Sequence, residues 1–355
     1  DSSKIFNDST DWLVGAYVSK LSEANDLESY YNGWESEILD SQYTANNYAV
    51  FTQLDSWLPH AHQLSVGLRI EKRTTEYSDS EGDNFNPDET MWGGHIALSK
   101  VITHQHSAYI RLARGYKAGG INMGLPTELK QYKEFDTETL INREIGLKSN
   151  FLDNTLITRL ALFHMDRKNQ QVNASQQNPA KPEQFTIYTA NATSSKAYGL
   201  ELELNYTVTE SLTIDSTLGY LRATYDDYAY FDKYGTSIDI SGRELAHSPK
   251  YTYSFGVTYQ ADSGLFANIN VTGKDNFYFS DSHSEQSEGA NLVNAKIGYE
   301  AKDWSVSLWA RNLTDEKVAT RGFFFGNEPD LDWVNKKYQR YGAPRQVGIT
   351  LDYKF

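Results

Sequence analysis

The fold is decided by residues 198–206, which read Tyr198-Gly199-Leu200-Glu201-Leu202-Glu203-Leu204-Asn205-Tyr206. Even-numbered positions carry Tyr or Leu, whereas odd-numbered positions carry Gly, Glu or Asn. Because successive side chains of a β-strand point to opposite faces, this stretch predicts a strand with one apolar and one polar face. The same alternation recurs at Leu64/Val66/Leu68/Ile70, Ala108/Ile110/Leu112, Tyr251/Tyr253/Phe255/Val257/Tyr259, Leu265/Ala267/Ile269/Val271, Val293/Ala295/Ile297/Tyr299, Trp304/Val306/Leu308/Ala310 and Val347/Ile349/Leu351/Tyr353/Phe355.

About fourteen such segments of roughly ten residues follow one another, and this is the length of a tilted strand that crosses a bilayer. The links between them alternate in length. Short links lie at 57–61, 152–154, 209–210, 261–264 and 301–303, and long ones at 21–45, 74–89, 116–137, 168–195, 225–248, 274–288 and 320–338. Strict alternation is typical of a transmembrane antiparallel β-barrel with short periplasmic turns and long extracellular loops. A soluble propeller would instead show a repeat of roughly 40–50 residues, and we find none.

The composition narrows the class of protein. Among 355 residues there are 25 Tyr, 16 Phe and 7 Trp, no Cys, and a formal net charge of −14. The acidic balance argues against nucleic-acid binding, which needs a basic surface for the phosphates. The absence of Cys excludes disulfides and thiolate metal sites in this chain. Aromatic residues near the ends of the apolar stripes, such as Tyr206, Tyr259 and Trp304, predict the girdles of a membrane barrel.

Several ordered blocks resemble one family. They are Arg114-Gly115-Tyr116-Lys117-Ala118-Gly119-Gly120-Ile121-Asn122, Glu144-Ile145-Gly146-Leu147-Lys148, Tyr198-Gly199-Leu200-Glu201, Ala310-Arg311-Asn312-Leu313-Thr314-Asp315-Glu316 and Tyr341-Gly342-Ala343-Pro344-Arg345. In this order and spacing they are similar to the C-terminal two-thirds of the barrel of TonB-dependent outer-membrane receptors. The resemblance extends over nearly all of the chain from about Tyr48 onward.

The resemblance implies a 22-stranded barrel closed by an N-terminal plug. We therefore expect residues 1–355 to be the C-terminal portion of such a barrel, without the plug and the first strands. It further implies TonB-energised uptake of a bulky, scarce nutrient, most often a ferric siderophore, in the outer membrane of a Gram-negative bacterium. The implied partners are membrane lipid, the ferric chelate, and the TonB complex through the N-terminal region. A passive 14-stranded channel or an adhesion-type barrel is the alternative.

No grouping of residues predicts catalysis, a cofactor or a metal site. His60, His62, His104 and His106 fall in two short turns, where polar turn residues are expected. The acidic segment 79–89 departs from the EF-hand pattern, so a solvated loop is favoured over a calcium site. We expect a binding and transport protein rather than an enzyme.

Candidate ligand contacts are the aromatic residues of the long loops and two cations near outer strand ends. Aromatic faces suit catechol, hydroxamate or sugar groups, and cations suit an anionic ferric chelate. The alternative is that the aromatics pack the loops together and that the cations are solvated. The candidates are Tyr30, Tyr31, Trp34, Tyr225, Tyr228, Tyr230, Phe231, Tyr234, Phe323, Phe324, Phe325 and Trp333, with Lys117 and Arg321 as the cations.

Overall fold

One antiparallel sheet dominates the computed structural model, which describes residues 4–6, 8–31, 34–178, 185–232 and 236–355. Fourteen strands form its path in the order in which they occur along the chain. They are β1 (Thr10–Tyr31), β2 (Trp34–Leu58), β3 (His62–Asp79), β5 (Asp88–Thr103), β6 (His106–Lys117), β9 (Glu138–Phe151), β10 (Leu156–Gln177), β11 (Phe185–Thr209), β12 (Leu212–Asp227), β15 (Tyr251–Gln260), β16 (Leu265–Lys274), β17 (Ala290–Glu300), β18 (Trp304–Arg311) and β21 (Gln346–Tyr353).

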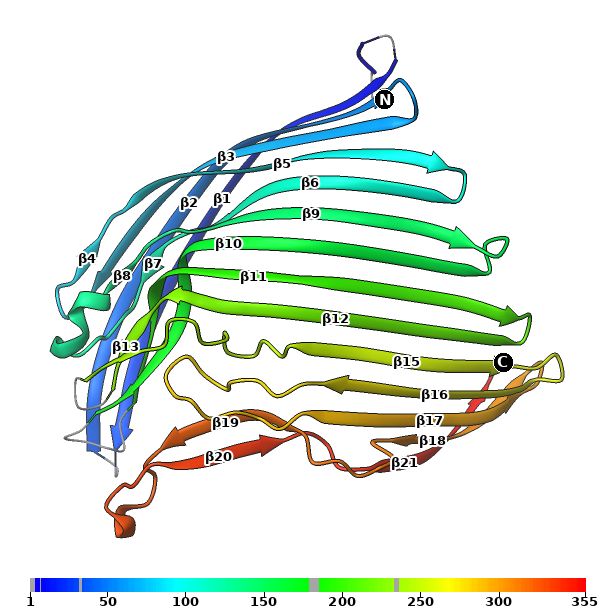
Figure 1. Cartoon of the computed structure of the whole chain (residues 1–355). Helices are drawn as coiled ribbons and strands as arrows, with labels where there is room; N and C mark the ends of the chain where they lie inside the picture. Colours follow the sequence, from blue (N-terminus) through cyan, green and yellow to red (C-terminus); the bar gives the residue numbers. More distant parts are fainter. Residues whose placement is uncertain (1–3, 7, 32–33, 179–184, 233–235) are drawn as a thin grey trace.

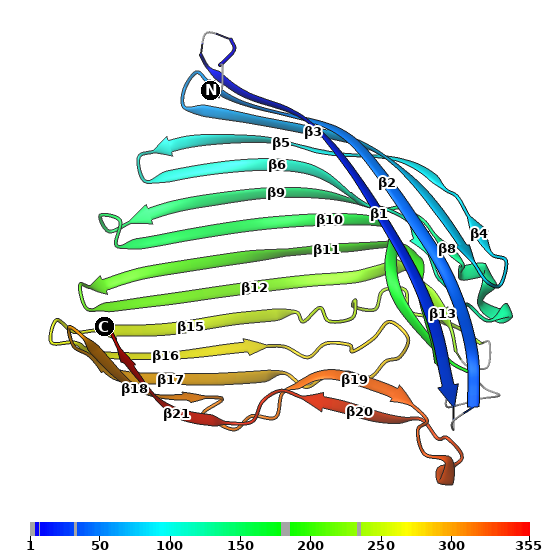
Figure 2. The ribbon, with the colours of Figure 1, turned by 180° about the vertical axis from the view of Figure 1, so that it is seen from behind.

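The sheet curves into a trough, as the two opposite views show (Figure 1, Figure 2). Within the described residues, β1 pairs with β2 and β21 pairs with β18, so these two strands form the edges of the path. The fourteen antiparallel strands confirm the predicted wall of a transmembrane barrel. No helix in the described part of the chain has the length and apolar character needed to cross a bilayer.

The smaller elements gather at the end of the sheet opposite the short turns (Figure 1). Three two-stranded ribbons and two short 3-10 helices lie there, and β4 extends the edge of β3. These elements are β4 (Asn84–Phe85), β7 (Gly120–Ile121), η1 (Thr127–Tyr132), β8 (Glu134–Phe135), β13 (Ala229–Phe231), β14 (Ser237–Asp239), β19 (Ala319–Phe325), η2 (Pro329–Leu331) and β20 (Lys336–Tyr341).

Two of the predicted long loops are mostly strand. Segment 21–45 continues the β1–β2 ladder, which is paired out to Tyr31 and Trp34. Segment 168–195 continues the β10–β11 ladder out to Gln177 and Phe185. The prediction was wrong here because these extensions rise beyond the apolar band, so they lack the hydrophobic stripe that marks a membrane-crossing strand.

Register aligns the apolar stripes into one continuous band. Leu202 of β11 lies opposite Leu160 of β10 and Leu218 of β12. At the far edge of the sheet, Leu308 of β18 lies opposite Ile349 of β21, whose side chain is 73% exposed. A row of exposed aliphatic side chains on every neighbouring strand is the surface that a bilayer covers.

Aromatic residues border the band at the short turns. Tyr299 at the end of β17 and Trp304 at the start of β18 have ring centroids 5.7 Å apart, and Tyr353 of β21 lies opposite Trp304. This arrangement confirms the predicted girdle on that side, because amphipathic rings favour the boundary between lipid and water.

The opposite face of the sheet is polar and lines the interior of the barrel. Arg159 of β10 and Glu203 of β11 form an ion pair at 3.1 Å on this face. Large rings also cover glycines of neighbouring strands there. A Cβ at Gly146 would lie 2.1 Å from the ring of Tyr109, and one at Gly15 would lie 2.2 Å from the ring of Phe51. The glycines therefore leave the space in which these rings lie flat against the wall.

Candidate functional site: the outer end of the barrel

The outer end holds the main buried cluster of the molecule. The β10–β11 extension contributes small or aromatic residues, and the loops after β6 and β12 pack against them. The cluster consists of Leu125, Leu129, Val172, Ala174, Tyr188, Ala190, Ala192, Tyr225, Tyr228 and Ile240. This packing explains why the β10–β11 ladder continues so far beyond the apolar band.

Two of the predicted ligand contacts belong to this cluster. Tyr225 is 1% exposed and Tyr228 is 5% exposed, and their ring centroids are 5.0 Å apart. The hydroxyl of Tyr225 donates a hydrogen bond to a carboxylate oxygen of Asp281. Burial, followed by the nearby Asp281 charge, raises the pKa of Tyr225 far above its usual value, so the phenol stays protonated. Both residues therefore pack the loops against each other, which was the alternative to contact with a ligand. Tyr230 packs against the same cluster.

Arg243 ties the loop after β12 to the loop after β16. Its guanidinium donates to the backbone oxygens of Ser280 at 3.0 Å and His283 at 2.9 Å, and it lies 4.7 Å from the ring of Tyr278. Burial lowers the pKa of His283, so this imidazole is neutral at pH 7. These contacts join the two loops at the outer end.

The last outer loop is a hairpin of β19 and β20 that carries the three consecutive Phe residues. Phe325 packs on Phe185 at 4.9 Å and on Tyr338 at 5.1 Å between centroids. Phe323 is 47% exposed and Phe324 is 39% exposed. Phe325 thus anchors the hairpin, whereas Phe323 and Phe324 remain accessible from outside. Trp333 follows η2 and is half-buried, with its carbonyl against Gly326.

Two arginines face each other across this hairpin. Arg321 of β19 is the direct cross-strand partner of Arg340 of β20, and both are exposed. Neither has an ion pair with a carboxylate within the described ranges. Like charges directly opposite in a sheet are unfavourable unless an anion lies between them. The sequence reasoning identified Arg321 but missed Arg340, because only the register reveals the pair.

The remaining candidates are scattered or only partly described. Lys117 is exposed at the end of β6, opposite Glu138 in the ladder. Only the backbone is described for Tyr30, Tyr31 and Trp34, at the outer end of the β1–β2 ladder, and for Phe231 in β13. Tyr234 lies outside the described residues.

The acidic segment 79–89 has protein partners. Asp79 accepts hydrogen bonds from the hydroxyl of Tyr77 and from two backbone N–H groups, and Asp83 pairs with Lys133 at 2.9 Å. Glu89 accepts from the backbone N–H of Gly119. These carboxylates therefore connect segment 79–89 to the neighbouring loops.

The four histidines lie at two short turns, as predicted. His60 and His104 are turn residues, whereas His62 begins β3 and His106 begins β6. A ring nitrogen of His62 lies 3.0 Å from the carbonyl oxygen of Pro59, and His106 contacts the ring of Phe151 at 5.2 Å. Both contacts are local to the turns.

Comparisons with known proteins agree with this architecture. Residues 2–313 match the family described as "TonB dependent receptor-like, beta-barrel". The pesticin receptor of Yersinia pestis is 24% identical over 299 residues, which are 80% of this chain and 41% of that protein. The probable TonB-dependent siderophore receptor PiuA of Acinetobacter baumannii is 26% identical over 229 residues, covering 62% of this chain and 30% of that protein.

Solved structures share the fold. The ferric yersiniabactin uptake receptor FyuA from Yersinia pestis superposes with a TM-score of 0.77 at 20% identity, covering 98% of this chain and 51% of that one. The copper transporter OprC gives a TM-score of 0.72 at 13% identity, covering 98% of this chain and 54% of that one. The chain thus spans less than half the length of these curated relatives and about half of these solved chains. The chain belongs to the TonB-dependent receptor β-barrel family, because the family match extends over most of its length.

Proposed function

We propose that this chain takes part in the TonB-energised uptake of a ferric siderophore. Family membership supports transport of this kind, and the pesticin and PiuA receptors among its relatives point to iron chelates as cargo. We propose further that residues 1–355 form the C-terminal portion of a 22-stranded barrel. The share of its relatives that the chain spans supports this division, and TonB would act through the N-terminal region of the complete receptor.

The observation that carries the proposal is the surface of the β19–β20 hairpin. Phe323 exposes its ring on the same face of the hairpin as the Arg321–Arg340 pair, and Phe324 exposes its ring on the other face. Ferric chelates of catecholate or carboxylate ligands are anionic and present flat, partly apolar faces. Unpaired guanidinium groups recognise such carboxylates and phenolates by charge-assisted hydrogen bonds, and exposed rings stack on the ligand.

The proposal is tested with the full-length receptor in a strain that takes up iron through it. Cells are offered ferric yersiniabactin, a ferric catecholate or ferric citrate with radiolabelled iron. We expect Arg321→Gln/Arg340→Gln and Phe323→Ala/Phe324→Ala each to weaken binding by about tenfold or more, because each pair removes about 1.4 kcal/mol or more of contact energy. Phe325 is kept in both variants because it anchors the hairpin.

The matched control is Lys302→Gln, which removes a positive charge from a short turn at the other end of the barrel. It should bind as the wild type does. Loss of TonB should abolish uptake while leaving binding intact. Unchanged binding of all three chelates by both hairpin variants would refute the site, and uptake that persists without TonB would refute the energised mechanism.

A further inference from the structure

His283 lies at a junction of four outer elements. It belongs to the loop after β16, and its backbone oxygen accepts a hydrogen bond from Arg243 of the loop after β12 at 2.9 Å. Its ring centroid is 6.2 Å from that of Phe324 of β19. The hydroxyl of the preceding residue, Ser282, accepts a hydrogen bond from the backbone N–H of Ser175 in the β10 extension. His283 therefore lies where the wall, two loops and the last hairpin meet.

The β19–β20 hairpin rests on the same loop. Gly322 of β19 lies against Phe279, since a Cβ on this glycine would be 2.2 Å from the phenyl ring. On the same face of the hairpin, Lys337 of β20 forms an ion pair with Glu285 at 3.5 Å. Glu285 is two residues beyond His283, so the ion pair and the imidazole belong to one short turn, 283–285. The position of the hairpin thus depends on the shape of this turn.

A hydrogen bond within the turn requires a neutral imidazole. The backbone N–H of Glu285 donates to Nδ1 of His283 at 3.2 Å. Because a backbone N–H is only a donor, Nδ1 must be unprotonated, and the single proton of the neutral ring is on Nε2. Burial lowers the pKa of His283, the Glu285 carboxylate partly offsets this effect, and the Arg243 guanidinium adds to it. The turn as built is therefore the neutral form.

A proton on His283 would change the contacts of the turn in three ways. It would place the N–H of Nδ1 against the N–H of Glu285, so their hydrogen bond would be lost. The positive ring would compete with Lys337 for the Glu285 carboxylate. It would also lie near Arg243, a like charge that is bonded to the backbone of His283 itself. All three effects favour a rearranged turn in which Glu285 no longer holds Lys337.

The pH dependence of the contact has a definite sign. Once the hairpin has left the loop, the imidazole is solvated and its pKa returns toward the usual value of about 6.5. The docked state binds this proton less readily, because its pKa is lowered. Docking is therefore fully stabilised above about pH 6.5 and is weakened as the pH falls through the lowered value.

We propose that the turn 283–285 is an acid-sensitive latch for the β19–β20 hairpin. With a neutral ring, the turn keeps its shape, Glu285 holds Lys337, and the hairpin stays on the loop. After the uptake of one proton, Glu285 pairs with the imidazolium instead and the hairpin is released. Arg321 and Arg340 lie on the opposite face of this hairpin, so release also moves that face. The latch is a property of the loops and does not depend on which cargo is bound.

The test measures the distance between the hairpin and an outer loop in the full-length receptor. Residues 1–355 contain no Cys. Spin labels are attached to Asp330→Cys on the hairpin and Ser237→Cys in β14, after any cysteine elsewhere in the receptor has been replaced. Double electron–electron resonance is recorded in lipid nanodiscs between about pH 7.5 and about pH 5. We expect one narrow distance population at the higher pH and a second, broader population that grows as the pH falls.

Two variants separate the imidazole from the carboxylate. His283→Asn keeps an acceptor oxygen for the N–H of Glu285 but does not titrate, so the second population should stay absent at about pH 5. Glu285→Gln keeps the backbone N–H but removes the partner of Lys337, so the second population should already be present at about pH 7.5. Glu285→Gln keeps the test decisive even if His283→Asn folds poorly.

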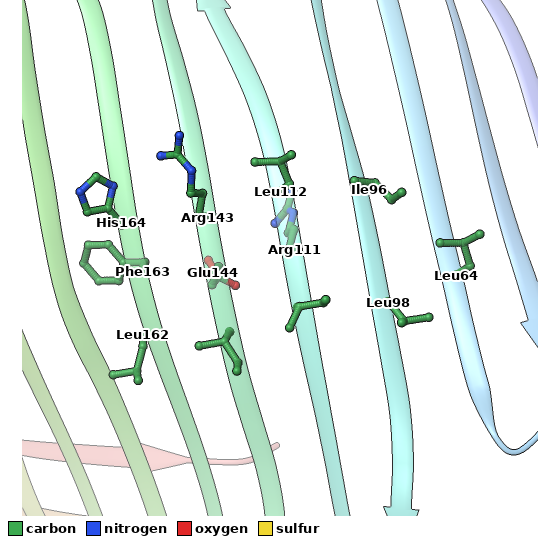
Figure 3. A pocket seen from close by; sticks show the side chains of 12 residues that line it. Leu64, Ile96, Leu98, Arg111, Leu112, Arg143, Glu144, Leu162, Phe163 and His164 are labelled. Atoms are coloured by element: carbon green, nitrogen blue, oxygen red, sulfur yellow. The ribbon is translucent and has the colours of Figure 1, made fainter.

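His164→Asn is the matched control. His164 of β10 lines a hollow of about 690 Å³ in the wall, together with aliphatic side chains of the apolar band (Figure 3). Its ring nitrogen lies 3.6 Å from a carboxylate oxygen of Asp166. The same residue type is thus removed from the wall instead of the turn 283–285, and this variant should respond to acid as the wild type does.

Four outcomes would overturn the proposal. A single distance population in the wild type over the whole range would mean that the hairpin stays docked in acid. An unchanged acid response in folded His283→Asn, or its loss in His164→Asn, would assign the proton to another group. Wild-type behaviour of Glu285→Gln at every pH would show that the ion pair with Lys337 does not hold the hairpin.

Discussion

Single residues on the two faces of a strand have different surroundings in this wall. Leu202 lies in the aliphatic band between Leu160 and Leu218, whereas Glu201, one residue earlier, points to the polar interior. In the full-length receptor, Leu202→Arg should lower the free energy of unfolding from lipid vesicles by about 2–4 kcal/mol, because the charge would lie in the hydrocarbon region. Glu201→Arg should change it far less. Urea titration in vesicles measures both, and equal losses would mean that the facing of β11 is the reverse of the one described.

The buried tyrosines of the outer layer make its stability depend on pH. Burial, with a smaller effect of Tyr132, raises the pKa of Tyr188 to about 12. An unfolded tyrosine ionises near pH 10. The stabilisation is therefore complete below about pH 10 and is lost as the pH rises toward 12, because the unfolded state releases its proton first.

Tyr188→Phe removes the ionisable hydroxyl and keeps the ring. We expect the outer layer of this variant to resist alkaline opening better than the wild type between about pH 10 and 12. Hydrogen exchange of the backbone amides at 188–192 would follow the opening. An identical pH profile for both proteins would show that Tyr188 does not couple to this transition.

At the scale of the strand, a glycine is needed for stability where an aromatic ring of the neighbouring strand lies over it. Gly146 of β9 lies under Tyr109 of β6, whose hydroxyl donates to Glu144 at 2.8 Å. Gly146→Ala should destabilise the wall by about 1–3 kcal/mol, because the added methyl group displaces this ring. Gly115→Ala is the control, since a Cβ there meets nothing within 4 Å. Equal midpoints in urea for the two variants would contradict this account of the β6–β9 pair.

At the scale of the whole molecule, the alternation of short turns and long segments predicts the orientation in the membrane, with the long segments outside the cell. The chain has no cysteine of its own. Ser237→Cys, in β14 of the outer layer, should react on intact cells with a reagent that does not cross the membrane. Lys302→Cys, in a short turn, should react only after the cells are opened. The opposite pattern would reverse the orientation and with it the placement of the proposed binding site.

The strand count, the antiparallel order and the facing of side chains could be predicted because a bilayer imposes a period of two on every crossing strand. Segment 198–206 is an example, since each of its Leu residues falls in the band. The extensions of β1–β2 and β10–β11 could not be predicted, because outside the lipid a strand needs no apolar stripe. Residues such as Asn173 and Ser175 read as loop, although both are paired in the ladder.

The candidate site was only partly visible in the sequence. Exposed and buried tyrosines look alike in a loop, so Tyr225 and Tyr228 were grouped with accessible aromatics although both are buried. Arg340 is separated from Arg321 by a whole hairpin, and only the ladder brings them together.

The order of strands in the sheet has a consequence for how the molecule can change over time. Every strand of the wall pairs with its nearest wall strands along the chain, so each outer segment joins two strands that are already neighbours. Lengthening or replacing one outer segment leaves the pairing of all other strands intact. Recombination between related genes can therefore exchange an outer hairpin such as β19–β20 as a cassette, while the lineage inherits the same wall.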